Sequence, residues 1–214
     1  MAQKKAAQDM LLHWSPRSPY VRKVLIAAHE TGVAHRIEFV RTVVAGAEPN
    51  IELMKENPQS RLPTLRLGDG TALYDSVVIC EYFDSLHAGQ KLFPEKFPER
   101  LVALRRHALG DGMLDTMLMW RGEQLRPVAN QSIKHMQAWK LKTNVSVDTL
   151  EEEAEALGRS PFSIGHIAIG VALGYIHFRF PELAWRNAHP RLTKWYEIFS
   201  ARPSVQATEP VDEP

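Results

Sequence analysis

The sequence predicts two domains, an α/β domain followed by an all-helical domain, and two observations lead to this organisation. Short apolar segments alternate with helical patterns over about the first 80 residues, as is typical of an α/β domain. After His87, the segment AGQKLFPEKFPER contains one glycine and two prolines, which mark a linker before a region of helical periodicity. We therefore place a tail at residues 1–9, the α/β domain at 10–87, the linker at 88–98 and the helical domain at 99–214.

The first half of the α/β domain is predicted to run strand, helix, strand. MLLHW at 10–14 is short and apolar and is followed by the turn-forming SPRSP, so we expect a buried strand that ends in a loop. A helix is expected to begin at Pro19, which suits a first turn, and to stop at Gly32. HRIEFV at 35–40 has the alternation of a second strand. The apolar residues that share one face of the helix are Val21, Val24, Leu25 and Ala28.

The second half of this domain is predicted to run helix, hairpin, helix. A helical piece near 50–56 is expected to end before Pro58. The segment TLRLGDGTALYDS predicts a β-hairpin with its turn at 68–70. Asp75 and Ser76 are expected to cap the next helix. The resulting order of elements is that of a thioredoxin-like domain.

Composition and charge exclude several classes of function. Lys and Arg number 26 against 25 acidic residues, so no global field is expected to recruit nucleic acid or an anionic membrane. The single Cys80 excludes an intramolecular disulfide and a CxxC redox pair, and it favours a reducing, cytoplasmic setting. The longest apolar stretch, 167–176, is too short for a membrane span, and the N-terminal residues show no secretory signal. The nine histidines show no metal-ligand spacing, so we expect no metal site.

Three short segments of the first domain carry residues suited to chemistry, namely SPRSPYVRKV (15–24), NPQSRLPTL (57–65) and LYDSVVICEYFD (73–84). With ALGYIHFRFPELAWR (172–186) and HPRLTKWYEIFSARPSVQAT (189–208), they resemble the glutathione transferase family, in particular its bacterial, serine-type members. The resemblance covers nearly the full chain apart from the tail. It implies the glutathione transferase fold, in which a thioredoxin-like α/β N-terminal domain binds glutathione and precedes an all-α domain.

The first segment supplies the candidate for thiol activation. Ser15 lies between the first strand and the first helix, where unpaired N–H groups and the helix dipole favour an anion. A thiol titrates near ~8.5, and a donated hydrogen bond together with the dipole would lower that pKa by roughly one to two units. The resemblance assigns this donor role to Ser15, six residues before Val21, with Ser18 in reserve. A turn serine at 15 and a helix N-cap at 18 are the alternatives.

The second and third segments supply the residues that the resemblance assigns to glutathione binding. Leu62 and Pro63 match a cis-proline loop whose backbone pairs with the cysteine of glutathione, the alternative being an ordinary trans turn. Arg61 is placed near the glycyl carboxylate, although a solvated arginine fits equally well. Asp75 and Ser76 match an acidic-serine pair that binds the γ-glutamyl group at a helix N-terminus, a role compatible with capping.

A pocket for a second, apolar substrate is less well defined. Trp14 and Tyr20 lie close to Ser15 in sequence, and Met113, Met117 and Trp120 share one face of a predicted helix. We consider these five as candidate pocket residues. Ordinary core packing predicts the same pattern, so both interpretations stay open.

The clearest helix of the second domain is expected at 164–176, where six apolar residues recur at helical spacing and form a buried stripe. Members of the family usually carry the capping box S/T-x-x-D before it, and here Ser163 is followed by His166 instead. Histidine is expected to be the poorer partner for the Ser163 N–H group. His166→Asp is therefore expected to be neutral or stabilising. The residues of the stripe are Ile164, Ile167, Ala168, Val171, Ala172 and Tyr175.

Together the motifs predict a cytoplasmic, homodimeric glutathione transferase of detoxification, with glutathione as co-substrate and a small, apolar electrophile as second substrate. Serine in place of cysteine at position 15 favours transfer or addition over thiol exchange. Dehalogenation, ether cleavage, isomerisation and peroxide reduction begin with the same activated thiol and stay open as alternatives. A protein that binds glutathione or apolar ligands without turnover is the alternative of another class.

Overall fold

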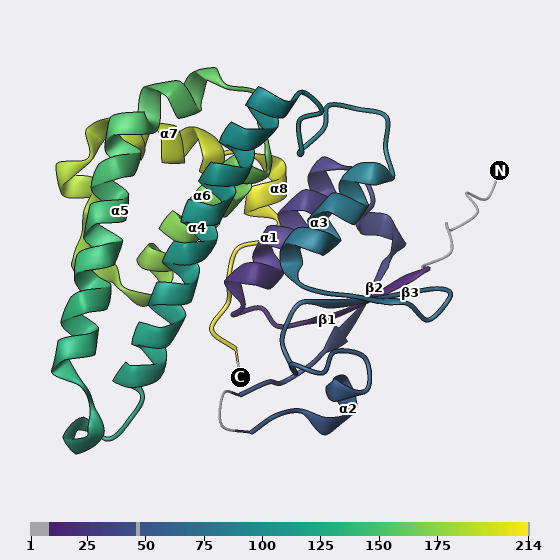
Figure 1. The fold of residues 1–214 in the computed structure, drawn as a ribbon, viewed down its shortest axis with the longest axis horizontal. Coiled ribbons are helices and arrows are strands. Elements are labelled where there is room, and N and C mark those ends of the chain that lie inside the picture. The colour runs from purple at the N-terminus through teal and green to yellow at the C-terminus, as the bar shows by residue number, and fades with distance from the viewer. Residues whose placement is uncertain (1–8, 46–47, 214) are drawn as a thin grey trace. The chain divides into compact units, whose positions relative to one another are not determined.

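The computed structural model describes residues 9–45 and 48–213. The chain forms two compact units. The first runs to Leu92 and includes the chain from Ala207 onward, and the second spans Phe93–Gln206. The first unit contains a sheet with helices, and the second is helical (Figure 1).

The last residues of the chain belong to the first unit, although they follow the helical unit in the sequence. The predicted helical domain at 99–214 includes the last residues, yet these belong to the first unit, where the N–H group of Val211 donates to the carbonyl oxygen of Pro16 at 3.3 Å. A compact unit can combine segments that are far apart in the sequence. The predicted domain boundaries therefore stay a prediction. The predicted tail at 1–9 lies outside the described residues except for Asp9.

The sheet of the first unit has four strands in the order β2-β1-β3-β4. β1 (Met10–Trp14) pairs parallel with β2 (Ile37–Arg41) and antiparallel with β3 (Thr64–Leu67), which pairs antiparallel with β4 (Ala72–Leu73). Both predicted strands and the hairpin are confirmed. β2 begins later than predicted because Ala34–Arg36 forms a 3-10 turn.

In the described part of this unit, the helices that accompany the sheet are α1 (Pro19–Glu30), α2 (Ile51–Met54) and α3 (Ser76–Ser85). The predicted signals mark their ends. Pro19 opens α1, and the chain leaves that helix through Gly32 at a φ of 74°, a left-handed conformation that suits glycine. α1 and α3 pack together and cover one face of the sheet (Figure 1). The side chains at the centre of this layer are fully buried, among them Leu12, Val24, Leu65, Ile79 and Phe83.

The second unit consists of helices. They are α4 (Phe97–Gln124), α5 (Ile133–Arg159), α6 (Ile164–Arg179), α7 (Pro190–Ser200) and α8 (Pro203–Gln206). The two long helices α4 and α5 lie side by side (Figure 1). A mixed sheet with helices followed by a helical unit is the fold class predicted from the sequence.

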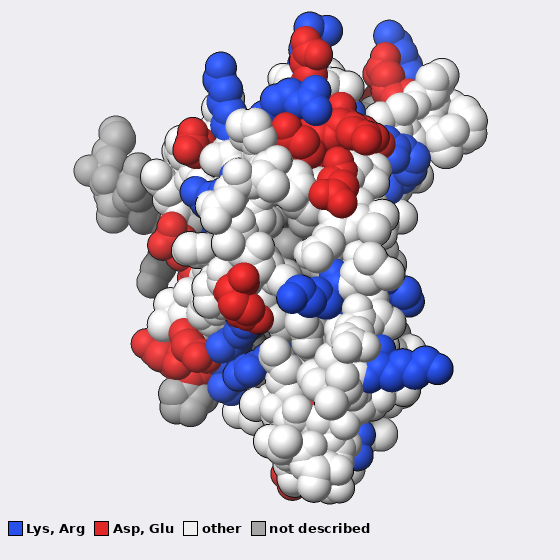
Figure 2. Space-filling view, turned by 90° about the vertical axis from the view of Figure 1, so that its left-hand side faces the viewer, with Lys and Arg blue, Asp and Glu red and all other residues white. Residues whose placement is uncertain are grey.

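The surface carries charges of both signs. Acidic and basic side chains lie interspersed on the face drawn in Figure 2, which agrees with a formal net charge of +1. Across the described residues, no helix combines the length and the apolar character needed to cross a membrane. In the same part of the chain, no cluster of three or more His, Cys, Asp or Glu side chains could hold a metal ion.

α6 is the central helix of the second unit. Every residue of 164–176 is buried, so the predicted apolar stripe extends around the whole helix. Glycines allow its close approach to α4. A Cβ atom added at Gly110 would lie 2.5 Å from the carbonyl carbon of Ala168, and one at Gly165 would lie 2.8 Å from the carbonyl oxygen of Ala103. The backbones of α4 and α6 therefore pack closer than side chains would permit.

This contact gives a matched test on one helix. Gly110→Ala forces a methyl group against the backbone of α6, so we expect a loss of about 2 kcal/mol or more in the free energy of unfolding. Gly112→Ala meets no atom within 4 Å and should gain about 0.5–1 kcal/mol from helix propensity. Urea unfolding of both variants measures the difference. Equal stability of the two would contradict the close approach.

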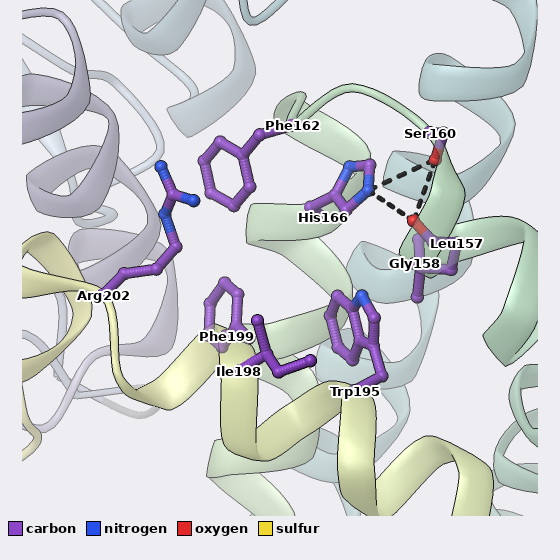
Figure 3. Close-up of a pocket in the computed structure, with 9 residues that line it drawn as sticks. All are labelled: Leu157, Gly158, Ser160, Phe162, His166, Trp195, Ile198, Phe199 and Arg202. Carbon is purple, nitrogen blue, oxygen red and sulfur yellow. Dashed lines mark hydrogen bonds between the residues drawn. The ribbon is translucent and has the colours of Figure 1, made fainter.

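The start of α6 has a complete capping box although its second residue is a histidine. The Ser163 N–H group donates to Nδ1 of His166 at 3.2 Å, so the histidine fills the reciprocal position. Its Nε2 donates to the carbonyl oxygen of Leu157 at 3.0 Å (Figure 3). The ring also packs 5.5 Å from Phe162 and 6.2 Å from Trp195. Aspartate could make only the first of these contacts, so His166→Asp is now expected to destabilise the protein.

The burial of His166 predicts a dependence of stability on pH. Burial lowers the pKa of this ring from 6.5 to about 4, because both ring nitrogens lie among protein atoms and the charged form loses its water. The unfolded chain therefore takes up the proton at higher pH than the folded chain does. The contribution of the neutral ring is complete above pH 6.5 and is lost as the pH falls to about 4, by about 3 kcal/mol in total.

The measurement compares the unfolding free energies of the wild type and of His166→Gln between about pH 7 and about pH 4. Glutamine keeps a donor and an acceptor but does not titrate, so its loss of stability over this interval should be about 3 kcal/mol smaller. Parallel pH profiles for the two proteins would show that His166 is not held neutral.

Candidate functional site

The strand register brings the three sequence motifs to one edge of the sheet. In the antiparallel pair β1–β3, His13 lies opposite Thr64, so the end of β1 meets the start of β3. Leu65 lies opposite Leu73, so the end of β4 meets the same place. Ser15 follows β1, Leu62 and Pro63 precede β3, and α3 begins soon after β4. Residues far apart in sequence therefore gather at this edge.

Ser15 is well placed to donate a hydrogen bond to a ligand. It follows the last residue of β1 and is half-buried, and its carbonyl oxygen accepts from the Ser18 N–H group at 3.2 Å. Within residues 9–45 and 48–213, the Ser15 hydroxyl has no hydrogen-bond partner. Ser18 differs. Its hydroxyl oxygen accepts from the Val21 N–H group at 3.3 Å, so it caps α1, which is the alternative weighed for it above.

The loop before β3 is held by two buried polar residues. The Leu62–Pro63 peptide bond is cis, and the Arg61 side chain is exposed. The amide of Asn57 donates to the carbonyl oxygen of Arg61 at 3.3 Å and to the hydroxyl oxygen of Thr64 at 2.9 Å. The Thr64 hydroxyl in turn donates to the same carbonyl at 2.8 Å. Asn57 and Thr64 thus fix both ends of the loop.

The N-terminus of α3 offers groups that suit a carboxylate. Asp75 is exposed and caps the helix, its Oδ1 accepting from the Val77 N–H group at 3.1 Å. Ser76, the first helical residue, is 2% exposed, and its hydroxyl has no partner among the residues that the structure describes. Capping by Asp75 leaves other N–H groups of the first turn unpaired within the helix. Capping and anion binding are therefore compatible here.

An apolar cluster joins two parts of this edge. Val21 of α1, Leu53 and Leu62 form a buried cluster, and Trp14 packs against it. The cluster therefore fixes Trp14, the residue before Ser15, against Leu62 of the cis-proline loop.

The candidates for a second-substrate pocket have different surroundings. Trp14 and Tyr20 are half-buried in the first unit. Met113, Met117 and Trp120 are buried on α4, and the Trp120 ring lies 4.5 Å from that of Phe180. Burial of these three favours core packing over contact with a substrate. Their assignment to a pocket stays a prediction.

The sequence analysis missed a polar contact between β1 and the segment before the loop. His13 Nδ1 lies 2.8 Å from the Thr42 hydroxyl, and its Nε2 lies 3.3 Å from a carboxylate oxygen of Glu56, without hydrogen-bond alignment. Arg66 Nε approaches the other oxygen of Glu56 at 3.5 Å. The contact is an ion pair when the histidine is protonated. It connects the strand that leads to the serine with Asn57, the anchor of the loop.

Comparisons with known proteins agree with this arrangement. A model of the glutathione S-transferase N-terminal domain matches residues 17–86, and a model of the C-terminal domain matches 146–197. The uncharacterised GST-like protein YibF of Escherichia coli K12 is 32% identical over 203 residues, covering 94% of this chain and 98% of YibF. The chain belongs to the glutathione transferase family.

Solved structures of this family have the same fold as the chain. A glutathione transferase family member from Pseudomonas fluorescens Pf-5, described with bound glutathione, is 38% identical with a TM-score of 0.91. The match covers 94% of this chain and 99% of that one. A glutathione S-transferase from Methylobacillus flagellatus KT, described with bound GSH, is 32% identical with a TM-score of 0.85, over 94% of this chain and 100% of that one. The glutathione transferase fold predicted from the sequence is confirmed.

The loop anchor can be tested on stability alone. Thr64→Val keeps the shape of the side chain but removes the hydroxyl that serves the Arg61 carbonyl and the Asn57 amide, so we expect a loss of about 1–3 kcal/mol. The matched control is Thr149→Val on α5, where the exposed hydroxyl donates to the Val145 carbonyl oxygen.

The control should change the unfolding free energy by no more than about 0.5 kcal/mol. Thermal or urea unfolding measures both variants. If Thr64→Val were as mild as Thr149→Val, the hydroxyl of Thr64 would not anchor the loop.

Proposed function

We propose that this family member is a serine-type glutathione transferase that activates the thiol of glutathione for attack on a small, apolar electrophile. The observation that carries the proposal is the Ser15 hydroxyl. It has no partner within the described residues and lies at the sheet edge that also holds the Leu62–Pro63 loop and the start of α3. The relatives described with bound glutathione support the choice of ligand.

In this proposal each end of glutathione meets groups of opposite charge. The γ-glutamyl carboxylate accepts from Ser76 and from N–H groups of the first turn of α3, where the helix dipole favours an anion. The carboxylate of Asp75 accepts from the γ-glutamyl ammonium group. The backbone of Leu62 pairs with the cysteinyl residue, and the exposed guanidinium of Arg61 faces the glycyl carboxylate. These contacts place the sulfur beside Ser15.

The chemical step begins with loss of the thiol proton to water. The hydroxyl of Ser15 donates a hydrogen bond to the resulting thiolate. The proposal assigns this role to no other group. Lowering the thiol pKa by about one unit raises the thiolate fraction at neutral pH by up to about tenfold and corresponds to about 1.4 kcal/mol. The thiolate sulfur then forms a C–S bond with the electrophile. In a substitution, the displaced group leaves with the electron pair of the bond that breaks; in an addition, the π pair of the activated double bond moves to the neighbouring atom, which takes a proton from water. Serine forms no disulfide, so the site does not perform thiol exchange.

We place this activity in the cytoplasm, in a homodimer that serves detoxification. The one cysteine of the described residues, Cys80, is buried and free, which supports a reducing compartment such as the cytoplasm. The apolar electrophile follows from the resemblance and from the half-buried aromatic side chains of Trp14 and Tyr20, which flank Ser15 in the chain.

Substitution of the serine tests the proposal. In the wild type, the ultraviolet thiolate band of bound glutathione should titrate at least about one unit below the ~8.5 of an ordinary thiol. Ser15→Ala should return that pKa toward ~8.5 and lower kcat/KM by about 10–100-fold, while calorimetry shows glutathione affinity within a few fold.

Ser18→Ala is the matched control. It removes the cap of α1, so it should cost about 1 kcal/mol of stability and leave the thiolate band unchanged. Loss of the band in this variant, with the band retained in Ser15→Ala, would transfer the role to Ser18. Glutathione binding without any band in the wild type would reject thiol activation and leave a binding protein.

A further inference from the structure

His189 holds both of its ring nitrogens against oxygen atoms of the helical unit. It lies at the start of α7, which packs against α5 (Figure 1). Its Nδ1 is 2.5 Å from the carbonyl oxygen of Trp185, and its Nε2 is 2.8 Å from Oδ1 of Asp148 on α5. A carbonyl oxygen and an ionised carboxylate only accept hydrogen bonds, so both nitrogens must donate. The geometry therefore requires the imidazolium form of the ring.

His166 of the same unit shows the contrast. Its Nδ1 accepts from the Ser163 N–H group, whereas its Nε2 donates to the carbonyl oxygen of Leu157. One acceptor and one donor describe the neutral ring. The two histidines are thus held in different protonation states. A rise in pH leaves His166 as it is but removes a proton that the contacts of His189 need.

Two carboxylates of α5 face the start of α7. Asp148 meets His189, and Glu151, one turn further along α5, accepts from the N–H groups of Arg191 at 3.2 Å and of Leu192 at 2.7 Å. Nε of Arg191 donates to the same carboxylate at 3.0 Å. The first turn of a helix has unpaired N–H groups and the positive end of the dipole, so carboxylates stabilise it. The start of α7 is therefore fastened to α5 by charge.

The groups around His189 set the direction in which its pKa moves. Burial lowers the pKa, because the charged ring loses water. The hydrogen bonds to Asp148 and to the Trp185 carbonyl oxygen raise it, as do the negative charges of Asp148 and Glu151. The net direction is upward from 6.5, so the contacts outweigh the burial.

The other charged groups of the neighbouring elements leave this balance in place. Arg191 pairs with Glu151, and the guanidinium of Arg186 lies over an aromatic ring, 5.0 Å from its centre. Glu197 of α7 lies more than two turns further along the helix than His189. α6 and α8, which also pack against α7, carry no acidic residue. The carboxylates that act on the histidine are therefore those of α5.

Loss of one proton costs His189 one of its two contacts. A neutral ring that keeps its Nδ1–H group on the Trp185 carbonyl oxygen turns a bare nitrogen toward the carboxylate of Asp148, and their lone pairs repel each other. The Asp148 side chain is 65% exposed and can turn to water, whereas the carbonyl oxygen is part of the backbone. The contact that deprotonation breaks is therefore the one with α5.

We propose that His189 is a proton-dependent clamp, which holds the start of α7 on α5 while its ring is protonated and releases it as the pH rises. Because the pKa of this ring is higher in the folded chain, the clamp contributes fully below about 6.5, and the contribution is lost as the pH rises through the folded value. The segment that gains freedom is the connection at 181–189 with the first turn of α7. All of these residues lie in the helical unit, so the inference does not depend on the chemistry proposed for Ser15.

Two measurements on the wild-type protein test the clamp. Heteronuclear NMR of the ring nitrogens should show that His189 titrates above 6.5 and carries protons on both nitrogens at lower pH. Hydrogen exchange in the first turn of α7, corrected for the intrinsic exchange rate, should show protection that falls at least about threefold between about pH 6 and about pH 9. The reporting amides are those of Arg191, Leu192 and Thr193, whose acceptors are Glu151 and the His189 carbonyl oxygen.

Asp148→Asn separates the charge from the contact. The asparagine amide donates to a bare Nε2 while the Nδ1–H group stays on the Trp185 carbonyl oxygen, so a neutral His189 keeps both contacts. We expect the ring to titrate at lower pH than in the wild type, and the first turn of α7 to keep its protection up to about pH 9. The matched control is Glu155→Gln, two turns further along α5, whose side chain is 64% exposed against 65% for Asp148. This control should behave like the wild type.

Three results would overturn the proposal. They are titration of the wild-type ring at or below 6.5, protection of the first turn that does not fall as the pH rises, and a fall in Asp148→Asn as large as in Glu155→Gln. The first two results come from the wild type, so the proposal remains testable even if a variant does not fold.

Discussion

The antiparallel register of β1 and β3 is the constraint on which the candidate site depends. Leu12 and Leu65 lie opposite each other and are both fully buried, so a slip by one residue would turn each of these side chains away from the core. The same register sets Thr64 opposite His13 and thereby brings the cis-proline loop to the serine at the end of β1. Apolar burial on one face of the sheet thus positions polar groups at its edge.

The helical unit depends on a comparable constraint, which is the packing of its central helix against the neighbouring helices. α6 has no polar face, and its contact with α4 depends on glycines at positions 110 and 165. The start of the helix is held by Ser163 and His166, and the second nitrogen of that histidine reaches back to Leu157 at the end of α5. One side chain therefore links the start of α6 to the end of α5 and also lines a pocket between these helices and α7.

Local signals explain why the sequence predicts much of the fold. Pro19 and Gly32 mark the ends of α1, and Asp75 caps α3, because caps and turns depend on residues close in the chain. Contacts between residues far apart in the chain leave no such local signal. Nothing in the pattern pairs His13 with Glu56, and only the fold reveals Thr64 as an anchor of the loop. Met113, Met117 and Trp120 show a further limit, because helical spacing is identical for a core and for a pocket wall.

The segment SPRSP contains two serines, and their surroundings favour a different role for each. The oxygen of Ser18 accepts from the Val21 N–H group, so this serine is committed to the start of α1, although a hydroxyl that accepts can still donate. Ser15 has the shorter connection to the cis-proline loop, since it directly follows Trp14, which packs in one cluster with Leu62. Hydrogen bonding alone would permit either serine to meet a thiolate. The position of each along the strand-to-helix turn, and not its chemistry, is the reason that we propose Ser15 as the donor.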